Sequence, residues 1–127
     1  MGDPFCPSFL IRCRGNEVLL QQALLNLLYN AFDAVLSEDN PIIQFTTTSV
    51  ENQILFTVRD NGCGVPKELQ ENLFKPFVSD KKRTSGLGLG LTLAEVIAKD
   101  HNGSIGYAPI NGSGSEFSLV LPQSTKP

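Results

Sequence analysis

The chain has 127 residues, which is the length of one ordinary domain. Hydrophobic residues make up 41% and charged residues 18%, so the chain can bury a core and does not have a disordered composition. The net charge of −3 argues against a dedicated nucleic-acid binder. No apolar run approaches the length of a membrane span, and no signal peptide opens the chain. We therefore expect a single cytoplasmic domain over 1–127, with its core at about 8–122 and no insertion into a membrane.

The number and spacing of the cysteines and histidines argue against several kinds of functional site. The three cysteines are an odd number without a C-x-x-C spacing, and His101 is the single histidine. A disulfide framework and a zinc site are both disfavoured by that count. A catalytic triad would need His101 together with a G-x-S-x-G elbow, which is absent, as are H-E-x-x-H and the G-x-x-x-x-G-K-[ST] phosphate loop.

The first half of the chain predicts three strands and one long helix. Residues 8–13 are short and apolar and predict an edge strand. Residues 18–36 contain no glycine or proline and many Leu and Ala residues, which predicts a helix. Residues 42–50 and 54–60 are rich in Ile, Phe, Val and Thr and are separated by a short polar turn, which predicts a β-hairpin.

The second half predicts a turn, a loop, two helices and two closing strands. Residues 61–66 are a glycine- and proline-rich turn, and a short helix is expected over 66–72. The basic, then glycine-rich stretch 74–90 has no clean period and predicts a loop that is either functional or disordered. A helix over 91–100, with Thr92, Glu95 and Lys99 on its polar face, is followed by expected strands over 103–108 and 115–121. This order predicts an α/β two-layer sandwich, in which a mixed, mostly antiparallel sheet has helices on one face.

The long helix carries an unusual polar stripe of amides. With about 100° per residue, five polar side chains fall within an arc of about 80°: Gln22, Asn26, Asn30, Asp33 and Ser37. Amide oxygens are neutral ligands that suit a hard cation such as Mg²⁺, particularly one that also holds phosphates. A solvated helix face, or amides satisfied in the core, explains the stripe equally well.

A carboxylate follows the second hairpin strand. Asp60 stands at the end of that strand, and Gly62 and Gly64 allow the backbone to come close to a ligand. A carboxylate there can accept a hydrogen bond from an exocyclic amine, which would select adenine over guanine. An ordinary turn aspartate is the alternative interpretation.

The third constellation is a glycine run that opens the second long helix. It consists of Gly86, Leu87, Gly88, Leu89, Gly90 and Leu91. Alternating glycines leave the amides unobstructed, and a helix N-terminus favours anions, so this segment suits phosphate. A Rossmann site is disfavoured because no strand precedes the run and no acid follows at the required distance. Nearby Lys81, Lys82 and Arg83 can add charge to a phosphate site or form a solvated basic run.

In this order and spacing, the three segments closely resemble the catalytic, ATP-binding domain of sensor histidine kinases. That domain belongs to the ATPase superfamily of gyrases, certain heat-shock chaperones and mismatch-repair proteins, which share the Bergerat-type fold. Residues 26–31 resemble its asparagine box, 60–64 its first glycine box, 74–77 its phenylalanine box and 86–91 its second glycine box. Residues 114–117 are similar to the start of its last strand.

The resemblance implies a role for each matching residue. Asn30 is the expected Mg²⁺ ligand with Asn26 beside it, and Asp60 is expected to take the adenine amine. Gly62 and Gly64 would shape the base pocket, the residues 86–91 would surround the phosphates, and the stretch 74–85 would be a lid with Lys81 as its phosphate contact. Ser115 stands where the family often has a threonine near adenine. Asp33 replaces a frequent Lys or Arg and could be linked to the metal through water.

The resemblance also implies the reaction class. Hydrolytic relatives place a glutamate one turn before the metal asparagine, and an amide such as Asn26 cannot serve as that general base. The implied function is to bind Mg-ATP and donate its γ-phosphate to a histidine on a separate dimerisation domain, with a response regulator as the indirect partner. No residue is expected to act as a general base. His101 is expected to be structural, because the family commonly has a histidine between this helix and strand.

Three other functions remain open from the sequence. They are a non-catalytic nucleotide-binding regulatory module, an ATPase of the gyrase or chaperone type, and a serine kinase of the anti-sigma type. The last two would ordinarily have glutamate in place of Asn26. The phosphoacceptor domain is expected to be absent from this chain, whose parent protein could be free in the cytoplasm or the cytosolic part of a membrane-anchored sensor.

Overall fold

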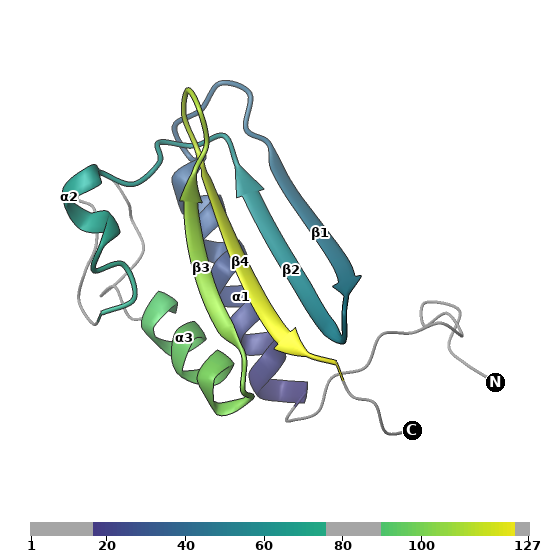
Figure 1. Ribbon diagram of the computed structural model, residues 1–127. Coiled ribbons are helices and arrows are strands. Elements are labelled where there is room, and N and C mark those ends of the chain that lie inside the picture. Colours follow the sequence, from purple (N-terminus) through teal and green to yellow (C-terminus); the bar gives the residue numbers. More distant parts are fainter. Residues whose placement is uncertain (1–16, 76–89, 124–127) are drawn as a thin grey trace.

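The computed structural model describes residues 17–75 and 90–123 (Figure 1). Their elements are α1 (Glu17–Ala34), β1 (Ile43–Val50), β2 (Gln53–Asp60), α2 (Lys67–Gln70), α3 (Gly90–Asp100), β3 (Ser104–Pro109) and β4 (Ser115–Pro122). The strand expected over 8–13 and the stretch 76–89 of the expected loop lie outside the described residues. Within the part that is described, no helix combines the length and the apolar character that crossing a membrane requires.

The four described strands form one sheet with the order β1-β2-β4-β3, and each neighbouring pair is antiparallel. Helices α1 and α3 lie side by side and cover one face of this sheet (Figure 1). The arrangement confirms the predicted two-layer α/β sandwich. The hairpin of β1 and β2 is closed by Glu51 and Asn52, which both have positive φ angles, as the type I′ turn between twisted strands requires.

The core lies between the two layers. In β4 every second side chain is buried, beginning with Ser115 and continuing through Phe117, Leu119 and Leu121. The helices meet this face with small and branched residues, namely Leu20, Ala23, Leu27, Ala31 and Ala34 from α1 and Ala94, Ile97 and Ala98 from α3. Because so many are alanines, the helices approach the strands closely, and each fully buried leucine contributes about 1.5–3 kcal/mol of transfer free energy.

The prediction that the long helix continues to Leu36 is wrong at its C-terminal end. The helix ends at Ala34, and the Leu36 N–H then donates to the Asp33 carbonyl over 3.4 Å, which tightens the chain into turns. Ser37 therefore leaves the predicted amide stripe. Helix α2 is also shorter than the predicted 66–72, because only Lys67–Gln70 is helical.

His101, the single histidine of the chain, lies directly after the C-terminal end of α3. The Gly103 N–H donates to the Ala98 carbonyl over 2.8 Å while Asn102 takes a left-handed φ of 61°, which is a common way to end a helix. The Nδ1 atom of His101 lies 2.8 Å from the Ile97 carbonyl oxygen. These contacts support the predicted structural role of His101.

Two glycines hold the loop after β2 against the end of α1. The Cys63 N–H donates to the Ala34 carbonyl over 3.1 Å, and a Cβ atom on Gly62 would clash with that same carbonyl. A Cβ atom on Gly114, whose φ is 132°, would clash with the Asp60 carbonyl. We call this meeting of α1, the loop after β2 and the β3–β4 connection the glycine junction. Only glycine allows these backbones to approach so closely.

We expect Gly62→Ala and Gly114→Ala each to lower the free energy of unfolding by about 1–3 kcal/mol, because the new methyl group displaces backbone. The matched control is Gly106→Ala in β3, where an added Cβ would meet no atom within 4 Å. That control should stay within about 0.5 kcal/mol of the parent chain. Urea unfolding curves measure all three, and wild-type stability in Gly62→Ala would contradict the described packing.

Candidate functional site

Two predicted site residues meet at one end of the sheet. Asp60 is the last residue of β2 and Ser115 is the first residue of β4, and the two are direct partners in the antiparallel pairing. Asp60 is 3% exposed and Ser115 is fully buried. The Asp60 carboxylate is therefore shielded from solvent and lies next to the Ser115 hydroxyl. The two polar groups are at one end of a core face that is otherwise apolar.

The orientation of the Asp60 carboxylate is fixed by its own turn. The Gly62 N–H donates to Asp60 Oδ1 over 2.9 Å, and the Ser113 hydroxyl donates to the Gly62 carbonyl. A side chain that accepts from the backbone two residues later is typical of aspartate at turns. A backbone N–H, rather than a flexible side chain, therefore sets the orientation of the Asp60 carboxylate.

Asn61 braces the same turn from the other side. Its Oδ1 accepts from the Ile42 N–H over 2.8 Å and its Nδ2 donates to the Asn40 carbonyl over 2.8 Å. The connection between α1 and β1 is thereby tied to the turn that carries Asp60. Sequence reasoning assigned no task to Asn61, although an asparagine between an aspartate and a glycine is a signal for a side chain that bonds nearby backbone.

The Ser115 hydroxyl has no hydrogen-bond partner among the described residues, although its oxygen is buried. Buried hydroxyls almost always have a partner in folded proteins, either protein or water. The Ser115 hydroxyl can both donate and accept a hydrogen bond, and it lies next to the Asp60 carboxylate. A ligand with several polar atoms along one edge would form hydrogen bonds with both groups. The structure thus brings together two of the residues that the sequence proposed for one pocket.

The predicted amide stripe lies on α1 and reaches the start of α3. Asn26, Asn30 and Asp33 are all half-buried on this helix. Asn26 accepts from Gln22 Nε2 over 3.0 Å and donates through its Nδ2 to the Gly90 carbonyl over 3.2 Å. That second bond joins residues 64 positions apart in the sequence, so the stripe meets the segment that opens α3.

The N-terminus of α3 provides an anion-favouring group next to the amides. Gly90 begins the helix, and a Cβ atom placed there would lie 3.9 Å from the Asn26 side chain. Leu91 follows and packs against the core. Free N–H groups at a helix start attract anions. Lys81 and the rest of the predicted glycine run, Gly86, Leu87, Gly88 and Leu89, lie outside the described residues.

Gly64 completes the turn after β2. It is buried and has a φ of 72°, and an added Cβ would lie 3.5 Å from the Gly114 carbonyl oxygen. The conformation is one that residues with side chains rarely adopt. Its partner Gly114 was missed as a site residue by sequence reasoning, because its close approach to the Asp60 carbonyl depends on the pairing of distant strands.

The amide oxygens of α1 are the described groups that suit a magnesium ion. Among the described residues, no three His, Cys, Asp or Glu side chains are grouped as metal ligands. Asn26 and Asn30 lie one turn apart on the same face of the helix. Magnesium commonly takes few protein ligands together with waters and phosphate oxygens, so this donor set fits it.

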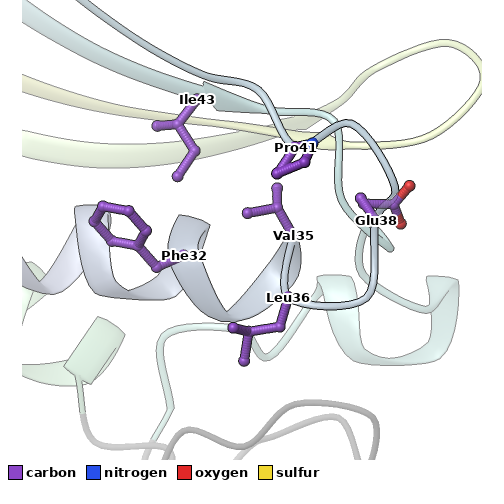
Figure 2. Close-up of a pocket in the computed structure, with 6 residues that line it drawn as sticks. All are labelled: Phe32, Val35, Leu36, Glu38, Pro41 and Ile43. Atoms are coloured by element: carbon purple, nitrogen blue, oxygen red, sulfur yellow. The ribbon is translucent and has the colours of Figure 1, made fainter.

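A separate apolar groove of about 420 Å³ lies between the end of α1 and β1 (Figure 2). Figure 2 shows Phe32 and Ile43 facing each other across it, with Val35 and Pro41 nearby and Glu38 at the rim. It contains none of the predicted site residues. Because its lining is apolar and its charged residue is a carboxylate, this groove does not suit a phosphate ligand.

Comparison with known proteins agrees with this arrangement. Residues 15–125 match the family described as histidine kinase-, DNA gyrase B- and HSP90-like ATPase. The chain is 41% identical over 104 residues to the signal transduction histidine-protein kinase AtoS of Escherichia coli, a match that covers 82% of this chain and 17% of that protein. It is 36% identical over 111 residues to the C4-dicarboxylate transport sensor protein DctB of Rhizobium meliloti, covering 87% and 17%.

Solved structures give the same result. The catalytic domain of histidine kinase ThkA superposes with a TM-score of 0.74 at 30% identity, and the match covers 87% of this chain and 70% of that one. The mycobacterial sensor histidine kinase MprB, at 22% identity, shares the fold with a TM-score of 0.79 over 89% of this chain and 78% of that one. The chain therefore belongs to the histidine kinase-, DNA gyrase B- and HSP90-like ATPase family, as an ATPase domain of the sensor histidine kinase type.

Proposed function

We propose that this chain binds Mg-ATP and donates its γ-phosphate to a histidine on a separate dimerisation domain. The observation that carries the proposal is the hydrogen bond from Asn26 to the Gly90 carbonyl. It sets the amides of α1 against the N-terminus of α3, where neutral oxygen ligands and an anion-favouring helix end lie together. The buried pair of Asp60 and Ser115 supplies a second, base-reading group.

Asp60 would read the base. Because the Gly62 N–H holds Oδ1, the second carboxylate oxygen would accept from the exocyclic amine of adenine, while guanine presents an oxygen at that place. Ser115 would add a hydroxyl to the same base edge, and Gly62 and Gly64 would shape the pocket wall. A charge-assisted hydrogen bond in a buried site is about twice as strong as a neutral one.

The triphosphate would lie along α1 and the start of α3. Asn30, with Asn26 beside it, would hold a magnesium ion, which would neutralise phosphate charge when bound. Asp33 would contact that ion through water. The glycine run 86–91 and Lys81 would bind the phosphates, with the backbone amides carrying most of the contact.

Transfer rather than hydrolysis is supported by the side chain at position 26. An amide is not basic enough to take a proton from water, and the nitrogen of the Asn26 amide donates to the Gly90 carbonyl. The nucleophile would be an imidazole nitrogen from the partner domain. It would form a bond to the γ-phosphorus as the bond from that phosphorus to the bridging oxygen breaks and ADP leaves.

The rest of the signalling machinery would come from other segments. The chain spans only 17% of the length of the two relatives named above. The phosphoacceptor and dimerisation domain of the same kinase would supply the histidine, and a response regulator would receive the phosphoryl group afterwards. The chain would act as a single ATP-binding domain in the cytoplasm.

A thermal-shift titration with ATP, ADP and GTP, each with and without Mg²⁺, tests the proposal. A ligand at 100 times its dissociation constant adds about 2.7 kcal/mol of stability, which raises the unfolding temperature of a chain this size by several degrees. We expect stabilisation by both adenine nucleotides, an increase for ATP with Mg²⁺, and none with GTP. No shift with any nucleotide at millimolar concentration would support a non-catalytic regulatory module instead.

We expect Asp60→Asn to weaken ATP binding by about 10- to 150-fold, which corresponds to the loss of about 1.5–3 kcal/mol for a hydrogen bond to a charged group. The variant keeps an oxygen for the Gly62 N–H but turns an amide donor toward the donor of the base. Isothermal titration calorimetry measures the loss. The control is the exposed Asp39→Asn, and equal ATP affinity in both variants would remove Asp60 from the pocket.

We expect Asn30→Ala to reduce the affinity for Mg-ATP more than the affinity for metal-free ATP, because it deletes an amide ligand of the metal. Titrations with Mg²⁺ and with a chelator separate the two affinities. Gln21→Ala removes an exposed amide from another face of α1 and should change neither value. Equal losses with and without metal in Asn30→Ala would show that Asn30 is not a ligand.

A further inference from the structure

Tyr107 in β3 has a buried hydroxyl that the site as described does not use. Its oxygen is inaccessible to solvent and has no hydrogen-bond partner among the described residues. The ring is held in place by Phe117, with centroids 5.1 Å apart and planes tilted by 50°. Phe74 packs edge-on against the other side of this cluster, at 6.3 Å from Phe117. The phenol is therefore well packed and has an unsatisfied polar tip.

The strand register places Tyr107 next to the base-reading end of the sheet. Tyr107 pairs with Phe117, and Pro109 pairs with Ser115, so Tyr107 is a diagonal neighbour of Ser115 on the helix-covered face. Ser115 in turn pairs with Asp60. Diagonal neighbours in an antiparallel pair lie about 7–8 Å apart, within reach of an aromatic side chain.

The hydroxyls of Tyr107 and Ser115 lie in neighbouring positions, and a single bound ligand would explain why neither has a partner in the part of the chain that the structure describes. A buried polar group without a partner is costly, and phenylalanine would fill the same space at Tyr107 without that cost. Both Tyr107 and Ser115 leave their oxygens unpaired within the described residues. Ser115 pairs with Asp60 on the neighbouring strand, and Tyr107 is the diagonal neighbour of Ser115 on its other side. A ligand with several polar atoms along one edge would satisfy them together.

We propose that Tyr107 is a further specificity-determining residue, whose hydroxyl donates to an acceptor atom on the nucleoside part of a bound adenine nucleotide. The inference rests on the proposed function and deepens it. The nucleoside is the part in question because Tyr107 neighbours the Asp60–Ser115 pair in the sheet, while the proposed phosphate groups lie along α1 and the start of α3. The ring–ring contact with Phe117 fixes the hydroxyl in advance of binding.

The test compares the two tyrosines of the chain. Tyr107→Phe deletes the buried hydroxyl, and Tyr29→Phe deletes a hydroxyl from a tyrosine that is 59% exposed on α1. Unfolding without nucleotide and calorimetric binding of ATP and ADP are measured for both variants and for the parent chain. We expect Tyr107→Phe to bind ATP and ADP with the same loss, about three- to tenfold, and to be at least as stable as the parent without nucleotide. Tyr29→Phe should match the parent in binding.

Three results would overturn the proposal. Parent-like affinity of Tyr107→Phe for both nucleotides would mean that the hydroxyl does not contact the ligand. Loss of ATP affinity alone, with ADP unchanged, would place the contact on the γ-phosphate rather than on the nucleoside. Lower stability of Tyr107→Phe without nucleotide would show that the hydroxyl already has a partner in the protein. Failure of the parent chain to bind any nucleotide is a different result, because it overturns the proposed function itself and this inference with it.

Discussion

The candidate site depends on one close backbone contact, the glycine junction. There the end of α1 accepts a hydrogen bond from the loop after β2, and Gly62 and Gly114 leave no space for a side chain on either side of the Asp60 turn. Such a contact is possible only without Cβ atoms. It fixes the Asp60 carboxylate relative to both α1 and β4, so the direction of the proposed base-reading group is set before any ligand arrives.

Helix α1 couples the core to the site. Its buried residues pack on the sheet and on α3, while Asn26, Asn30 and Asp33 occupy a neighbouring face of the same helix. Since side chains three and four positions apart share a face, the packing of the alanines determines where the amides point. The hydrogen bond from Asn26 to Gly90 then extends the same alignment to α3. The stability of the fold and the geometry of the candidate site therefore both depend on the packing of α1.

Much of this architecture is predictable from local pattern. The alternation in β4, the hairpin of β1 and β2 and the long apolar helix all give the correct elements, and the segment that carries Asp60 was placed at a strand end. The helix end at Ala34 was not predictable, because residues 35–37 contain no glycine or proline and the tight turn there is set by tertiary contacts. The tasks of Asn61 and Gly114, and the one proposed for Tyr107, depend on which strands pair, and no local pattern contains that information.

The turn at Glu51 and Asn52 has a practical consequence. Both residues are exposed and hold positive φ angles, and the turn lies at the end of β2 opposite Asp60, far along the sheet from the glycine junction (Figure 1). Exposed hairpin tips are where chains best tolerate added residues. A fluorescent label or an affinity tag inserted there would report on the domain without entering the end of the sheet that carries the proposed nucleotide site, whereas one extra residue in α1 would rotate everything beyond it by about 100°.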